Sequence, residues 1–152
     1  MKQILLSLAW CSIMLNAHAQ NEEKLIRSFF NGFEIKDWNM VAAQLAEDFT
    51  FTSPNNDDHI NIAKYKEKCW ATGLKFFRHI EFIKIVVDGN TAFSMYNITT
   101  TDNKIVHNVE YYTFSKGKIK SIETFFGTGV HYPGNSGNMR DFFIHEESRQ
   151  TK

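Results

Sequence analysis

Residues 76–126 decide the fold of this chain, and they read FFRHIEFIKIVVDGNTAFSMYNITTTDNKIVHNVEYYTFSKGKIKSIETFF. Three pairs of turn-forming residues divide this stretch: Asp88-Gly89, Asp102-Asn103 and Lys116-Gly117. Such pairs are typical of tight connections between antiparallel strands. The segments between them, residues 76–87, 91–101, 105–114 and 118–126, are rich in β-branched and aromatic residues. The pattern therefore predicts four strands in an antiparallel meander joined by three hairpins.

Upstream of this stretch, apolar residues recur at helical spacing. Residues 22–36 carry one apolar stripe and residues 60–74 carry another that stops at Gly73, while Asp37 is placed to cap a short helix between them. Residues 48–53 alternate and end at Pro54, which predicts one more strand. Three helices followed by a meander predict an α+β fold in which the helices pack on one face of a curved antiparallel sheet.

The overall composition excludes several classes of protein. Basic and acidic side chains both number 17 in the 152 residues, whereas a nucleic-acid-binding domain normally has a clustered basic excess. The same balance is unlike an acidic tail or a polybasic membrane-surface segment. We therefore expect a small globular domain that has no nucleic-acid partner.

Residues 1–19 have the features of a secretory signal peptide. Lys2 supplies a positive charge, residues 4–15 are mostly apolar, and Ala17 and Ala19 are the small residues that a signal peptidase reads. The apolar run is too short to remain as a membrane-spanning helix. We expect cleavage after Ala19 and a secreted or periplasmic product, whose single cysteine, Cys69, cannot form an internal disulfide.

Three segments carry a family resemblance. The helix with paired aromatic residues, followed by Lys36-Asp37-Trp38, by residues 45–54 (LAEDFTFTSP) and by the closing hairpin 114–119 (FSKGKI), resembles a SnoaL-like domain of the nuclear-transport-factor-2-like superfamily. The resemblance covers residues 22–127 of a domain that we place at residues 20–127, and it leaves residues 128–152 as an irregular C-terminal tail. It implies a cone-shaped α+β roll of the cystatin-like type, a pocket between the helices and the concave sheet, and a homodimer.

The catalytic residues of the family are only partly matched. The position of the isomerase general base is Ser53, and the position of the isomerase oxyanion tyrosine falls near Phe29, which has no hydrogen-bond donor. The cyclases of the family carry an acidic group near the end of the last strand, where this chain has Glu123. The resemblance therefore argues against an isomerase and leaves Glu123 as a candidate acid or base.

A second candidate, Glu110, lies on the third strand of the meander. If Lys116-Gly117 is a two-residue turn, Phe114 pairs with Ile119 and Glu110 falls opposite Glu123. Two facing carboxylates repel each other, so that one of them keeps its proton near neutral pH, which suits acid–base catalysis. A bulge in the hairpin would separate the two glutamates, and a solvated face beside the neighbouring lysines would leave both without a role.

Aromatic residues predict the walls of a pocket. We expect the ligand-binding side chains to be Trp38, Phe51, Tyr65, Met95, Tyr96 and Tyr112. Such a lining favours a small flat molecule, apolar or aromatic, that is held by a few polar groups.

The remaining polar residues predict neither a metal site nor a cofactor site. Asp57-Asp58-His59 is a tight cluster, but no further ligands follow at the spacing of a Ca²⁺-binding loop, so a solvated loop is expected. The histidines lack metal-binding spacing, and alternation places His107 on the face opposite Glu110.

Three functions are compatible with these observations. The first is an exported domain that binds a small molecule without a requirement for turnover. The second is a cofactor-independent cyclase, isomerase or dehydratase that uses Glu123 and Glu110 as acid and base. The third is a homodimeric interaction module whose pocket is filled by its own phenylalanines.

Overall fold

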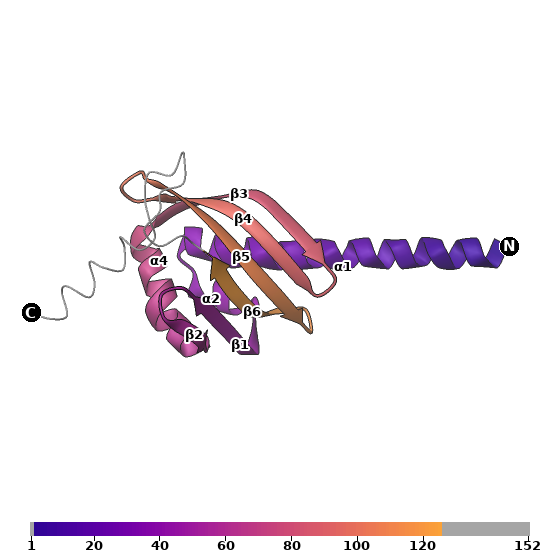
Figure 1. Ribbon diagram of the computed structural model, residues 1–152, viewed down its shortest axis with the longest axis horizontal. Coiled ribbons are helices and arrows are strands. Elements are labelled where there is room, and N and C mark those ends of the chain that lie inside the picture. The colour runs from indigo at the N-terminus through magenta and orange to yellow at the C-terminus, as the bar shows by residue number, and fades with distance from the viewer. Residues whose placement is uncertain (1, 126–152) are drawn as a thin grey trace, which may run out of the picture.

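The computed structural model describes the backbone of residues 2–125 and the side chains of residues 19–125. Helices lie against one side of a curved six-stranded sheet, and the first turns of α1 extend beyond the sheet (Figure 1). The expected α+β class is confirmed. The predicted tail, residues 128–152, lies outside the described residues.

The helices form where the apolar stripes predict them. Helix α1 spans Lys2–Ile35, so the expected signal peptide and the first helix of the domain are continuous. Helix α2 spans Trp38–Ala42, and the Asp37 carboxylate accepts hydrogen bonds from the backbone N–H groups of Asn39 and Met40, as a helix cap does. The third predicted helix is built from α3 (Ile62–Tyr65), the π-helical η1 (Lys66–Trp70) and α4 (Ala71–Phe76). Within the part of the chain that the structure describes, no helix has the length and hydropathy that a membrane span requires.

The meander is confirmed strand by strand. Its members are β3 (Phe77–Asp88), β4 (Thr91–Thr100), β5 (Ile105–Ser115) and β6 (Lys118–Phe125). Strand β1 (Leu45–Ser53) pairs with β6 in parallel, so the sheet is mixed and not wholly antiparallel as expected. A short strand that the sequence did not predict, β2 (Asp57–Ile60), folds back on β1, and the strand order is β2-β1-β6-β5-β4-β3.

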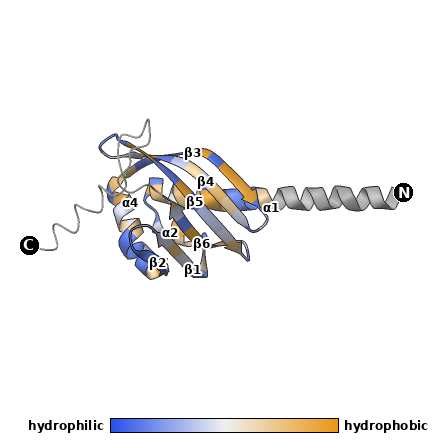
Figure 2. Cartoon of the chain, in the orientation of Figure 1, coloured by the Kyte–Doolittle hydropathy of each residue, from blue (hydrophilic) through white to orange (hydrophobic). Residues whose placement is uncertain are grey.

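The sheet has one buried face and one partly exposed face. Alternation along β4 buries Ala92, Ser94 and Tyr96, whereas Phe93 and Met95 point the other way and remain 52% and 43% exposed. The buried face packs on phenylalanines of α1, which form the centre of the core. Figure 2 shows that hydrophobic residues also continue to the end of β3, where Val86 is exposed. The helices therefore cover only the concave face of the sheet.

The sequence suggested that Gly73 ends the third helix. This expectation is wrong, because α4 continues to Phe76. A Cβ atom at Gly73 would lie 2.6 Å from the Phe33 ring, so the absence of a side chain lets α4 approach α1 closely. This glycine is therefore required for packing inside a helix.

Replacing Gly73 with alanine is expected to lower the free energy of unfolding by about 1–3 kcal/mol, because the new methyl group overpacks the Phe33 ring. At an unconstrained helical position the same change would stabilise the protein by about 1 kcal/mol. Urea denaturation measures the difference, with the exposed substitution Lys24→Ala as a control that changes stability by less than about 0.5 kcal/mol. A more stable Gly73→Ala variant would contradict the close packing.

Candidate functional site

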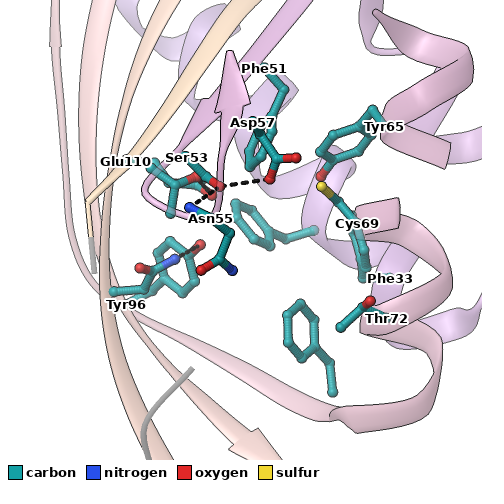
Figure 3. A pocket seen from close by; sticks show the side chains of 14 residues that line it. Phe33, Phe51, Ser53, Asn55, Asp57, Tyr65, Cys69, Thr72, Tyr96 and Glu110 are labelled. Atoms are coloured by element: carbon teal, nitrogen blue, oxygen red, sulfur yellow. Dashed lines mark hydrogen bonds between the residues drawn. The ribbon is translucent and has the colours of Figure 1, made fainter. Parts of the chain in front are cut away.

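A cavity of about 60 Å³ lies between the helices and the concave face of the sheet. Figure 3 shows Glu110 and Tyr96 from the sheet on one side of it and Tyr65, Cys69 and Thr72 from the helices on the other. Because a buried water needs about 10–15 Å³ of such space, the cavity has room for a few waters or a small organic group. Its aromatic lining consists of Phe30, Phe33, Phe51, Tyr65, Phe77 and Tyr96. Its polar lining consists of Ser53, Asn55, Asp57, Cys69, Thr72, Asn108, Glu110 and Thr124.

Glu110 is one of two buried carboxyl groups that line this cavity. It is 6% exposed on β5, where alternation turns it toward the helices. The Tyr112 hydroxyl donates to Glu110 Oε2 over 2.5 Å, and the Thr124 hydroxyl donates to Oε1 over 3.0 Å. Tyr96 also forms a hydrogen bond with this carboxyl group.

Burial raises the pKa of Glu110 above its ordinary value, because desolvation penalises the charged form. The hydrogen bonds from Tyr112, Tyr96 and Thr124 act in the opposite direction and offset part of this effect. Burial likewise raises the pKa of the phenols of Tyr65, Tyr96 and Tyr112, so they remain neutral donors. The carboxyl group is therefore held by neutral hydroxyl groups.

Asn108, which also lines the cavity, extends this network and leaves one buried polar atom without a partner among the described residues. Its Nδ2 donates to the Tyr96 hydroxyl oxygen over 2.6 Å. When Glu110 is ionised, the Tyr96 hydroxyl donates its hydrogen to the Glu110 carboxylate. The Tyr96 oxygen can then only accept from Asn108, so the amide nitrogen of Asn108 faces it. The residue is 4% exposed. Asn108 Oδ1, an acceptor, has no hydrogen-bond partner among the described residues.

A second carboxylate, Asp57, reaches the cavity from the β2 hairpin. It is 5% exposed, accepts a hydrogen bond from the Ser53 hydroxyl over 2.7 Å and pairs with the Lys68 ammonium of η1. Figure 3 shows the Ser53 to Asp57 hydrogen bond beside the cavity. The sequence had placed Asp57-Asp58-His59 in a solvated loop, but all three residues lie in β2, and only Asp58 and His59 are exposed. The Pro54-Asn55-Asn56 turn was the feature that could have indicated a hairpin carrying Asp57 back beside Ser53.

The two glutamates do not face each other. Phe114 pairs with Ile119, as predicted, but a bulge follows and Thr113 pairs with Ser121. Lys120 is the extra residue, so Glu110 lies opposite Thr124 and Glu123 lies opposite Tyr111. Glu123 is consequently on the outer face, half-buried, and the predicted carboxylate pair is wrong.

The comparisons with known proteins agree with this architecture. The family model of the SnoaL-like domain matches residues 26–122, which is more than half of the chain. The chain belongs to the SnoaL-like domain family. Among curated proteins, no sequence matches it.

Several solved structures superpose on this SnoaL-like domain. A proposed ketosteroid isomerase from Kribbella flavida superposes with a TM-score of 0.61 at 20% identity, over 76% of this chain and 84% of that one. An NTF2-like protein of unknown function from Burkholderia xenovorans gives 0.59 at 16% identity, over 76% and 89%. A proposed polyketide cyclase from Sinorhizobium meliloti gives 0.57 at 16% identity, over 67% and 94%. At these identities the likeness shows the nuclear-transport-factor-2-like fold.

The structure of this SnoaL-like domain brings three of the six predicted pocket residues to the cavity: Phe51, Tyr65 and Tyr96. Trp38 instead packs on Trp70 with ring centroids 5.6 Å apart. Met95 lies on the outer face, because it is adjacent to Tyr96 on a strand and side chains alternate. Tyr112 is fully buried and is not among the lining residues; its hydroxyl bonds Glu110 and also Ser94, the latter over 2.8 Å. These last three placements correct the sequence expectation.

The structure also places Phe29 and Ser53, the two positions where the sequence lacks the isomerase catalytic residues. Phe29 is a core residue of α1 that contacts the rings of Phe30 and Tyr65. Ser53 gains Asp57 as a hydrogen-bond partner, yet Lys68 already neutralises that carboxylate. His107 lies on the face opposite Glu110, as alternation predicted. Among the residues that the structure describes, no group of three His, Cys, Asp or Glu side chains is arranged to hold a metal ion.

Proposed function

We propose that this SnoaL-like domain binds a small, mostly apolar molecule in the cavity, with one polar end against Glu110 and Asn108. The observation that carries the proposal is the contrast between the aromatic walls and the buried polar end, where Asn108 Oδ1 has no partner among the described residues. Leaving a buried acceptor unpaired costs about 1–3 kcal/mol. A ligand that supplies a hydrogen-bond donor recovers this energy.

The geometry also limits the ligand. The cavity of about 60 Å³ favours a compact molecule, and the rings of Phe51, Tyr65 and Tyr96 favour a flat apolar or aromatic body. Benzyl alcohol is a suitable probe of this lining, because it combines one aromatic ring with one hydroxyl group.

Asn108→Leu is expected to weaken the binding of benzyl alcohol about tenfold, because it removes the unpaired acceptor and keeps the side-chain volume. Amide chemical-shift titration measures the affinity and shows whether the perturbed residues line the cavity. Asn97→Leu on the outer face of β4 is the matched control and should bind as the wild type does. Equal affinities in all three proteins would contradict a polar contact at Asn108.

A second candidate function is proton transfer by Glu110. The raised pKa of a carboxyl group in a cavity favours it, because a general acid or base works best when its pKa is near the operating pH. Glu123 lies on the other face, so Glu110 would act without it. Deuterium exchange at the α-carbon of an enolisable ketone tests this function. Exchange that is lost in Glu110→Gln supports it, and exchange equal to the buffer rate excludes it for that ketone.

We also propose export and dimer formation, as the sequence suggested. The signal-like segment 1–19 supports cleavage after Ala19 and a secreted or periplasmic location. The exposed rings and chains of Phe93, Met95 and Phe125 on the outer face support a contact between two copies. The mass of the protein recovered after expression tests the cleavage. Light scattering of the wild type and of Phe93→Asp tests the dimer.

A further inference from the structure

The chemical character of the cavity narrows the ligand beyond its size and shape. Its described lining includes two carboxyl groups, Asp57 and Glu110, and no lysine, arginine or histidine. We propose that the ligand is a small organic cation, an ammonium group on an apolar body, whose N–H groups bind Glu110 and Asn108. This inference rests on the proposed binding function.

The balance of charge in the cavity favours a cationic ligand. Lys68 neutralises Asp57, so that pair contributes little net charge. Among the described residues, no cationic side chain forms an ion pair with Glu110. The other titratable groups near Glu110 are Tyr65 of α3, Cys69 of η1, Tyr96 of β4 and Tyr112 of β5, all of which are neutral when protonated. The ionised form of Glu110 therefore has hydrogen-bond donors but no counter-ion, and a ligand cation would supply one.

The direction of the hydrogen bonds in the cavity also favours an ammonium group. Glu110 and Asn108 Oδ1 are acceptors at the buried end of the cavity, and an ammonium group has only donors. A carboxylate ligand would offer acceptors to acceptors and would place a negative charge beside Glu110. Asn55 Nδ2, a donor without a partner among the described residues, is on the hairpin with Asp57 and can serve an acceptor elsewhere on the ligand.

The aromatic wall of the cavity also favours a cation. The faces of phenylalanine and tyrosine rings carry partial negative charge and attract cations within about 6 Å. Phe51, Tyr65 and Tyr96 all line the cavity together with Glu110. The same rings that favour an apolar body therefore also stabilise a positive charge on it.

Cation binding is coupled to the proton of Glu110. Where the free protein holds the protonated carboxyl group, an ammonium ligand favours the ionised form, and one proton passes to the buffer. A neutral ligand releases no proton, because it brings no positive charge to stabilise the ionised form of the buried carboxyl group. Affinity for the cation should therefore rise with pH until Glu110 is ionised in the free protein.

Three ligands that share a benzene ring and differ in charge provide the test: benzylammonium, benzyl alcohol and benzoate. Calorimetry with the full chain is expected to show that benzylammonium binds about tenfold more tightly than benzyl alcohol, because hydrogen bonds between charged groups are stronger than those between neutral groups. Benzoate is expected not to bind. Repeating the titration in buffers of different ionisation enthalpy, at the pH of the Glu110 midpoint in the free protein, measures the protons released, which should be above zero for benzylammonium and near zero for benzyl alcohol.

Glu110→Gln separates the role of the charge from that of the cavity. This variant should lose the preference for benzylammonium and its proton release while it still binds benzyl alcohol. Asp58→Asn, an exposed carboxylate next to Asp57, is the matched control and should behave as the wild type. If Glu110→Gln does not fold, the comparison of the three ligands on the wild type still tests whether the cavity prefers a cation.

The outcomes distinguish this inference from the function on which it rests. If benzyl alcohol binds as tightly as benzylammonium, the ligand is not selected as a cation, and the binding function stands without it. If benzoate binds best, the assignment of charge is overturned. If none of the three binds, both the inference and the proposed function are contradicted.

Discussion

Replacing Phe30 with alanine is expected to lower the free energy of unfolding by about 3–5 kcal/mol, the range for removing a buried aromatic ring. Phe30 is 4% exposed on α1 and packs against Phe29, Phe33, Phe82 and Tyr96. Its ring therefore joins the helix to the concave face of the sheet and forms part of the cavity wall. Urea denaturation monitored by circular dichroism measures the loss.

The same substitution on the other face of the sheet is the control for Phe30. Phe93→Ala removes a ring that is 52% exposed and contacts Tyr111 on the outer face. Its effect on a monomer should be below about 1 kcal/mol, since most of the ring is already in water. Similar losses in the two variants would contradict the assignment of the buried face.

The stability of the wild type is expected to contain a component that falls as the pH rises above 4.5, the ordinary pKa of a glutamate. The folded pKa of Glu110 is raised, so the folded protein holds this proton more tightly than the unfolded chain does. Stability associated with Glu110 is therefore fully present below the unfolded pKa and is lost as the pH rises through the folded one. The loss is about 1.4 kcal/mol for each unit by which the pKa is raised.

The difference between the wild type and Glu110→Gln isolates this component. Lys120 lowers the pKa of Asp48, and the Thr100 hydroxyl lowers that of Asp102, so these groups act below 3.8 and in the opposite direction. Both are present in the variant and cancel in the difference. Denaturation at a series of pH values should show Glu110→Gln gaining stability relative to the wild type above pH 4.5. A constant difference across the series would contradict the burial of Glu110.

The fold could be predicted from the sequence because its determinants are local. Asp88-Gly89 and Lys116-Gly117 mark hairpins by their own conformational preferences, and Gly89 and Gly117 both have positive φ angles. The apolar stripe that includes Phe29, Phe30 and Phe33 marks the helix face that becomes the core. Each of these features needs only neighbouring residues to be recognised.

The site was less predictable because it depends on register and on contacts between distant segments. One extra residue, Lys120, turned Glu123 to the outer face and brought Thr124 to Glu110. Asp57 is buried only because β2 folds beside β1 and Lys68 reaches it from η1. Strict alternation would have excluded Met95 from the pocket, because Tyr96 is its neighbour on the same strand.

A carbon-detected NMR titration of the Glu110 carboxyl group tests the central claim most directly, because the binding site, its charge preference and its pH dependence all rest on this buried group. Comparison with Glu110→Gln assigns the signal. We expect a midpoint above the ordinary 4.5 in the free protein, and a lower midpoint when benzylammonium is bound. A midpoint at or below 4.5 that benzylammonium does not move would show a solvated carboxylate and would contradict the account.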